Sequence, residues 1–271
     1  MQATFERGGG TLKSILACGQ LAPVPGGIQE NTDRIRSLAR AAAGRGAAIL
    51  VLPELCLCGY PSAADARKWA VHPEGAEIAR LSACARENAI SLCFGFAELS
   101  PDDVLHNSMG FIDSAGILMS VYRKVHLWIT EKEWAVPGTG FQAMTAGGVR
   151  LGMWICYDTR FPETARSLAR SGATLGLVGS AWFGPSEEWE LAIRSRALDN
   201  GMFVAGASVQ GAFGAAPFRG ASLIVDPHGT VIARAREGAE EVICAEYDDD
   251  AVASFRSRLP LLTDLRPGSY G

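Results

Sequence analysis

Three residues that could together perform nucleophilic catalysis each follow a run of mostly apolar residues. They are a carboxylate, Glu54, an ammonium, Lys124, and a thiol, Cys156. Short apolar runs of this kind predict buried or half-buried strands. Active sites of α/β sheets lie beyond the ends of strands. We therefore expect the three side chains to meet at one site.

The chemistry available to this set is acyl transfer to cysteine followed by hydrolysis. A thiol attacks a carbonyl well only as the thiolate, so it needs a base or a cation beside it. Glu54 can take the proton and pass it to a leaving amine. Lys124 and the backbone N–H of Tyr157 can stabilise the oxyanion. His126 is an alternative base in a Cys–His dyad, and each residue taken singly also has a purely structural interpretation.

Composition favours one large globular domain. The chain has 271 residues, 48% of them hydrophobic and 20% charged, with a net charge of −4, which predicts a substantial core and argues against nucleic acid as a partner. Residues 1–12 read as a flexible, Gly-rich lead and 13–271 as a single domain. No apolar run reaches the length of a membrane span, and the N-terminus has no apolar signal core. We expect a cytoplasmic protein without a membrane partner.

The cysteines argue against disulfides and metal binding. There are seven of them, an odd number at irregular spacings, and several lie inside apolar runs where a free thiol behaves as a small apolar residue. Cys56 and Cys58 form a C-x-C pair without a matching second pair, so we expect no zinc site. We interpret every cysteine except Cys156 as structural.

Helices and strands interleave along the chain, with hairpins in addition. Besides the three runs above, strands are predicted at 14–20, 90–98, 108–113, 174–180, 202–208, 221–226, 230–234 and 241–247. Helices are predicted near Asn31 and Thr32, which offer cap chemistry, at 76–88, from Phe161-Pro162-Glu163 onward, and at 187–200. This order indicates an α/β fold with mixed rather than purely parallel sheets.

The flanks of the three candidate residues resemble the three signatures of the nitrilase superfamily of carbon–nitrogen hydrolases. The matching segments are 52–61, 122–127 and 152–163, and weaker similarity extends from about residue 14 to the end. The resemblance implies a four-layer αββα sandwich of two mixed sheets, a Glu54–Lys124–Cys156 triad and no metal or organic cofactor. It also implies a second glutamate ahead of a Pro-Gly turn, for which spacing favours Glu131 over Glu133.

The residues after the nucleophile indicate a branch of the superfamily. Cys156-Tyr157-Asp158 resembles amidase-type members, whereas nitrilases more often have Cys-Trp-Glu. The resemblance therefore implies a small-molecule substrate that is a linear amide or an N-carbamoyl amine. Nitrile hydrolysis, acyl transfer to an amine and a catalytically silent member of the fold remain alternatives. The identity of the substrate is left open.

Aromatic residues in or just after these segments are candidates for the substrate pocket. Together with Tyr157, they are Tyr60, His126, Trp134, Trp182 and Phe183. Rings of this kind could wall an apolar or amphipathic pocket, although plain core positions are an equal alternative.

The family resemblance also implies a homodimer or a larger even-numbered oligomer. It points to the helix that begins at Phe161 and to the tail after Asp250, whose apolar residues show no clear periodicity. Apolar side chains on an irregular tail are costly to leave in water, and a two-fold contact is the commonest way to cover them.

Overall fold

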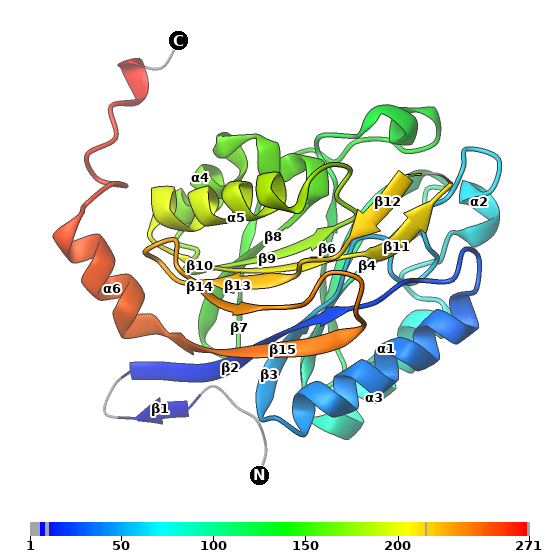
Figure 1. The fold of residues 1–271 in the computed structure, drawn as a ribbon, viewed down its shortest axis with the longest axis horizontal. Coiled ribbons are helices and arrows are strands. Elements are labelled where there is room, and N and C mark those ends of the chain that lie inside the picture. Colours follow the sequence, from blue (N-terminus) through cyan, green and yellow to red (C-terminus); the bar gives the residue numbers. More distant parts are fainter. Residues whose placement is uncertain (1–5, 9–10, 215, 270–271) are drawn as a thin grey trace.

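Two stacked β-sheets lie between two layers of helices (Figure 1). This computed structural model describes residues 6–8, 11–214 and 216–269. The first sheet has the order β15-β2-β3-β4-β5-β6, with β1 also paired to β2. Its strands are β1 (Glu6–Gly8), β2 (Thr11–Gln20), β3 (Ala47–Val51), β4 (Ser91–Leu99), β5 (Leu105–Ile112), β6 (Leu118–Arg123) and β15 (Glu241–Asp248).

The second sheet has the order β14-β13-β10-β9-β8-β7. Its strands are β7 (Ala143–Ala146), β8 (Val149–Ile155), β9 (Leu175–Ser180), β10 (Phe203–Ser208), β13 (Leu223–Val225) and β14 (Val231–Arg234). A separate two-stranded ribbon consists of β11 (Gln210–Phe213) and β12 (Ala216–Arg219). Both large sheets combine parallel and antiparallel pairs, so the predicted αββα fold with mixed sheets is confirmed.

Helices cover the outer face of each sheet (Figure 1). The first sheet packs against α1 (Ile28–Ala43) and α3 (Ala76–Asn88), and the second against α4 (Pro162–Arg170) and α5 (Ser186–Asn200). Shorter helices are α2 (Ala66–Trp69) and the 3₁₀ turns η1 (Ile129–Glu133), η2 (Cys156–Arg160) and η3 (Pro267–Ser269), and α6 (Asp249–Arg258) follows the last strand. Because both faces of each sheet are covered, central strands such as β3 are buried along their whole length.

The ends of the chain differ from the sequence prediction. Within the lead predicted as flexible, Glu6–Gly8 forms β1 against β2, and β2 itself begins at Thr11. The segment pairs with β2 through its backbone, which any sequence can do, so it needs no apolar pattern that could be recognised in the sequence. The tail also contains α6, whose first turn is capped by the Asp248 carboxylate through the Asp250 N–H at 3.0 Å. Residues 1–5, 9–10, 215, 270 and 271 lie outside the described part.

The start of α1 also differs from the prediction. The helix begins at Ile28, so Asn31 and Thr32 lie inside its first turn rather than at its cap. Asn31 instead accepts from the Val24 N–H and donates to the Val24 carbonyl, both at 2.8 Å. The Asn31 amide therefore fixes the loop before the helix. An Asn at this position looks like a capping residue when only the sequence is known.

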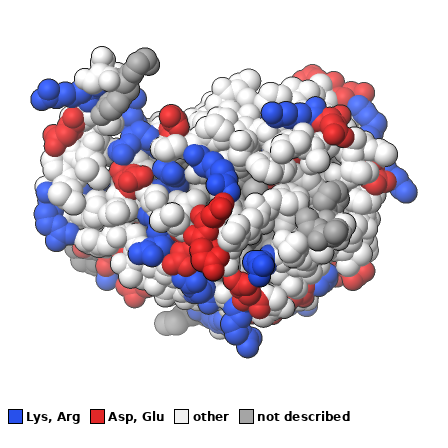
Figure 2. Space-filling view, turned by 45° about the horizontal axis from the view of Figure 1, so that its top comes forward, with Lys and Arg blue, Asp and Glu red and all other residues white. Residues whose placement is uncertain are grey.

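Charged side chains of both signs are interspersed on the face shown in Figure 2. Ion pairs in the described structure include Arg160 with Glu188 at 2.6 Å and Lys13 with Asp248 at 2.7 Å. In the described part of the chain, no helix is both long and apolar enough to cross a membrane.

Candidate active site

Glu54 follows β3 at a point where both sheets come very close to the chain. A Cβ on Gly95 of β4 would lie 2.4 Å from the Leu55 nitrogen, and one on Gly179 of β9 would lie 2.9 Å from the Glu54 nitrogen. Only glycine permits these approaches. Leu55 itself has φ +52°, which turns the chain sharply away from the strand. The carboxylate is therefore held between the two sheets and is completely buried.

Lys124 follows β6 and is also completely buried. Its backbone N–H donates to the Asn107 carbonyl and its carbonyl accepts from the Gly138 N–H, both at 2.8 Å. Its Nζ lies 2.7 Å from Glu54 Oε1 and 2.7 Å from Glu131 Oε1. Because a buried ammonium needs charged or hydrogen-bonding partners, the two carboxylates both stabilise and aim it.

The second carboxylate at Lys124 is Glu131, which is completely buried, whereas Glu133 is exposed. Besides Lys124, Glu131 accepts hydrogen bonds from the Tyr60 hydroxyl at 2.7 Å and from the Trp128 N–H at 2.8 Å. The short 3₁₀ turn η1 carries it into this position. Its oxygens are thus occupied by donors, which favours the ionised form.

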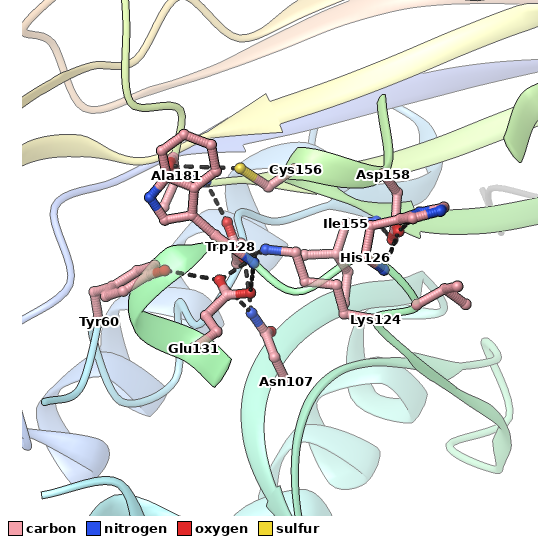
Figure 3. A network of polar contacts seen from close by, with 12 residues as sticks. Tyr60, Asn107, Lys124, His126, Trp128, Glu131, Ile155, Cys156, Asp158 and Ala181 are labelled. Carbon is pink, nitrogen blue, oxygen red and sulfur yellow. Dashed lines mark hydrogen bonds and ion pairs between the residues drawn. The ribbon is translucent and has the colours of Figure 1, made fainter. Parts of the chain in front are cut away.

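Asn107 is a site residue that sequence reasoning missed. Its Nδ2 donates to Glu54 Oε1 at 2.8 Å and to Glu131 Oε1 at 3.1 Å. The amide therefore shares one amino group between the two carboxylates that flank Lys124 (Figure 3). The prediction began this strand at residue 108, whereas β5 begins at Leu105, so Asn107 fell outside it.

Ala181 links the carboxylate to the thiol. Its N–H donates to Glu54 Oε2 at 2.7 Å, and its carbonyl lies 3.6 Å from Cys156 Sγ. Ala181 follows β9, so the same peptide segment contacts both side chains, and Figure 3 shows its carbonyl beside Cys156. Glu54 Oε1 is taken by Lys124 and Asn107, which leaves Oε2 as the oxygen on the Ala181 side.

Cys156 stands at a strained turn directly after β8. Its φ is +43°, in the left-handed region that non-glycine residues rarely occupy. Conformations of this kind cost about 1–3 kcal/mol and are concentrated at functional sites. Cys156 is buried but still 7% exposed, five of the other cysteines are at most 1% exposed, and Cys244 is half-buried. The turn therefore presents the thiol at the end of the strand.

The buried charges set the protonation states. Burial, which the Lys124 ammonium offsets only in part, raises the pKa of Glu54 from 4.5 to about 7. Burial, assisted by Glu54, raises the pKa of Cys156 as well. Burial also opposes ionisation of Lys124 and Glu131, but their mutual attraction wins, so the pKa of Lys124 is raised and that of Glu131 is lowered. The raised pKa keeps the Cys156 thiol protonated at neutral pH, whereas a pKa of about 7 lets the Glu54 carboxyl exchange a proton in that range.

A small cavity of about 50 Å³ opens beside Glu54, and its lining includes Tyr60, Ala181, Val209 and Phe218. Phe183 packs against Tyr60, with ring centroids 5.5 Å apart, and against Phe218 at 4.8 Å. Trp134 is 9% exposed and belongs to the same apolar cluster. Of the predicted pocket residues, the structure thus gathers Tyr60, Phe183 and Trp134 near this narrow, mostly apolar space.

The other predicted pocket residues have different surroundings. The His126 ring stacks on Phe161 with centroids 3.6 Å apart, and its Nδ1 lies 2.8 Å from the Asp158 carboxylate. Tyr157 packs edge-on against Trp128 at 4.9 Å. Trp182 lies 5.4 Å from Trp189 and is covered by the Arg160 guanidinium at 4.5 Å. No contact between His126 and Cys156 is seen in the described structure, so a Cys–His dyad gains no support.

Known proteins resemble this chain over most of its length. The family model for carbon-nitrogen hydrolases matches residues 15–257. An (R)-stereoselective amidase of a Pseudomonas species is 32% identical, covering 91% of this chain and 89% of that protein. A human omega-amidase is 32% identical, covering 89% of this chain and 91% of that protein.

A solved structure shares the fold. It is a Glu-to-Gln mutant of a Nesterenkonia amidase in which the acetamide moiety of fluoroacetamide is covalently added at the active-site cysteine. It aligns with a TM-score of 0.84 and 28% identity, covering 94% of this chain and 95% of that chain. The family match, the two-sheet fold and the amidase relatives agree with one another. The chain belongs to the carbon–nitrogen hydrolase family, the nitrilase superfamily.

Proposed function

We propose that this protein hydrolyses a linear, non-peptide amide or an N-carbamoyl amine through a thioester on Cys156. The observation that carries the proposal is the Ala181 segment, which contacts Glu54 Oε2 at 2.7 Å and Cys156 Sγ at 3.6 Å. A base and a nucleophile that both contact the same residue at the end of a strand are preorganised for proton transfer. The amidase relatives and the active-site cysteine of the Nesterenkonia enzyme support the same chemistry.

The first half of the reaction forms the acyl-enzyme. Glu54 accepts the thiol proton while Cys156 Sγ bonds to the carbonyl carbon. The Lys124 ammonium and the Tyr157 N–H stabilise the resulting oxyanion. When the tetrahedral intermediate collapses, the carbon–nitrogen bond breaks and Glu54 returns the proton to the leaving amine. A thioester and ammonia or an amine are the products of this half.

The second half releases the acid. Glu54, again a carboxylate, takes a proton from water as the water oxygen bonds to the thioester carbon. The carbon–sulfur bond then breaks, and the thiolate recovers its proton from Glu54. Glu131 stays ionised throughout because Lys124, Tyr60 and Trp128 donate to it. Its role is to hold the ammonium charged and in place.

Matched substrates test the proposal. We expect wild-type protein to release ammonia from propionamide or from an N-carbamoyl amino acid, and to release it more slowly from propionitrile. Cys156→Ala is the control and should release none. Faster turnover of the nitrile would favour nitrile hydrolysis, and hydroxamate formation outrunning hydrolysis in hydroxylamine would favour acyl transfer. Labelling of Cys156 by iodoacetamide without turnover of any of these compounds would contradict the proposal.

We also infer a homodimer or a larger even-numbered oligomer. On α5, Leu191 and Leu198 are 66% and 46% exposed, and Leu259 just after α6 is 46% exposed. The tail beyond α6 extends away from the two-sheet body (Figure 1), which suits contact with a neighbouring subunit. Light scattering across a dilution series tests this, because a fully active monomer at micromolar concentration would contradict it.

A further inference from the structure

Asp158 is a completely buried carboxylate that the proposed reaction does not use. It accepts a hydrogen bond from the Ile155 N–H at 3.1 Å, within the turn that carries Cys156. It also accepts from the His126 N–H at 2.9 Å and lies 2.8 Å from His126 Nδ1, in the segment just after Lys124. The Tyr122 hydroxyl of β6 donates to it at 2.6 Å. One carboxylate therefore joins both catalytic segments (Figure 3).

The two segments belong to different sheets. Lys124 follows β6 at the edge of the first sheet, and Cys156 follows β8 in the second. In the described structure no hydrogen-bonded ladder joins these sheets, so side-chain contacts set the distance between the ammonium and the thiol. Ring contacts reinforce the link, because His126 stacks on Phe161 and Tyr157 packs on Trp128.

Only an acceptor with several lone pairs fits this position. Two backbone N–H groups and a phenol donate to Asp158, and His126 Nδ1 at 2.8 Å donates as well in the tautomer that carries its proton there. A carboxylate accepts at both oxygens, whereas the amide of asparagine would turn its NH₂ toward donors. A buried donor left without an acceptor is destabilising, on the same scale as the strain of a residue such as Cys156 in the left-handed region.

We infer that Asp158 is a positioning residue that holds the Cys156 turn and the Lys124 segment in register across the two sheets. It acts through the residues it binds and does not itself contact the reacting atoms. The inference rests on the proposed function, since it concerns the alignment of the same nucleophile and oxyanion donor. Misplacement of a catalytic group by about 1 Å can lower a rate about a hundredfold. Loss of Asp158 should therefore lower kcat, while KM stays nearly unchanged.

Two variants and a matched control test the inference. Asp158→Asn removes the charge at constant size, and Tyr122→Phe removes one donor only. Tyr247→Phe is the control, because Tyr247 is another buried tyrosine whose hydroxyl contacts an aspartate, Asp249, at 2.8 Å, outside the site. For each variant kcat, KM, the thermal midpoint and the rate of Cys156 alkylation by iodoacetamide are measured.

We expect folded Asp158→Asn to lose about a hundredfold in kcat with KM nearly unchanged, and its Cys156 to alkylate about tenfold more slowly. Tyr122→Phe should lose about tenfold in kcat, and Tyr247→Phe should match wild type. Unchanged kcat and alkylation in folded Asp158→Asn would overturn the inference. If Asp158→Asn does not fold, equal kcat in the two tyrosine variants would overturn it. If wild type hydrolyses no amide, the proposed function fails and the alkylation rates alone decide this inference.

Discussion

Cys156 and Cys93 are two thiols of one apolar cluster with different surroundings. Burial raises the pKa of both. Cys93 lies inside β4, where its sulfur contacts the Met153 sulfur at 3.5 Å. Cys156 lies at a strained turn, with Glu54 and Lys124 close enough to shift its pKa in opposite directions. Burial makes a thiol inert, and the neighbouring charges decide whether it can be activated.

The comparison explains why the site contains two carboxylates. Glu131 keeps Lys124 charged, and Glu54 has its pKa raised to about 7, into the range of a base that works at neutral pH. A pair of titratable groups whose environments push their pKa values apart is typical of an acid–base division of labour. Among the residues that the structure describes, no such pair acts on Cys93, whose pKa is raised by burial and then by Cys56 and Cys18.

The largest expected difference comes from truncating each thiol. Cys156→Ala should abolish turnover and remain folded, because it removes the nucleophile. Cys93→Ala should keep its kcat but lose about 1 kcal/mol of unfolding free energy, the scale of deleting one buried heavy atom. Steady-state kinetics and thermal unfolding of both variants measure the two effects. Residual hydrolysis by Cys156→Ala above the uncatalysed rate would contradict the assignment of Cys156, rather than another group, as the nucleophile.

Next in size is loss of the base. Glu54→Gln keeps the shape of the side chain but cannot accept the thiol proton, so kcat/KM should fall by about 10²–10⁴-fold. Alkylation of Cys156 by iodoacetamide should slow in parallel, because less of the thiol is converted to the thiolate. Glu133→Gln, at an exposed position, is the matched control and should behave as wild type. A Glu54→Gln enzyme that retains wild-type alkylation would remove Glu54 from thiol activation.

Replacement of the oxyanion donor should have a somewhat smaller effect. Lys124→Arg keeps the positive charge, but a planar guanidinium does not fit between two buried carboxylates as a compact ammonium does. We expect kcat to fall about a hundredfold or more, the scale of losing one oxyanion donor. Kinetics with the same amide used for Glu54→Gln allow a direct comparison, and a near-normal kcat would place Lys124 outside the mechanism.

The smallest effect is the pH dependence of the intact enzyme. In the proposed mechanism the free carboxylate of Glu54 is the base, and its pKa is raised to about 7, so kcat/KM should be constant above that pH. Below it, kcat/KM should fall about tenfold per pH unit as the carboxylate becomes protonated. A pH–rate profile in buffers of constant ionic strength measures this fall of kcat/KM at acidic pH. A fall in kcat/KM centred near the unperturbed pKa of glutamate would show that burial does not raise the pKa of the catalytic base.

The sequence indicated candidate residues at strand ends better than those inside strands or turns. Glu54, Lys124 and Cys156 each directly follow an apolar run, and the structure brings them close together. Asn107 and Asp158 could not be assigned roles, because their importance comes from contacts with Glu54 and His126 on distant segments. The pairing of β15 with β2 is likewise non-local. The spacing that favoured Glu131 over Glu133 agrees with the side chain found against Lys124.

Trapping the acyl-enzyme tests the central claim most directly. Wild-type protein would be quenched with acid during turnover of an amide, digested and analysed by mass spectrometry. The account predicts an acyl group, with the mass of the substrate acid less water, on the peptide that contains Cys156 and none on the peptide that contains Cys93. Hydrolysis that proceeds with the acyl group on any other side chain would contradict it.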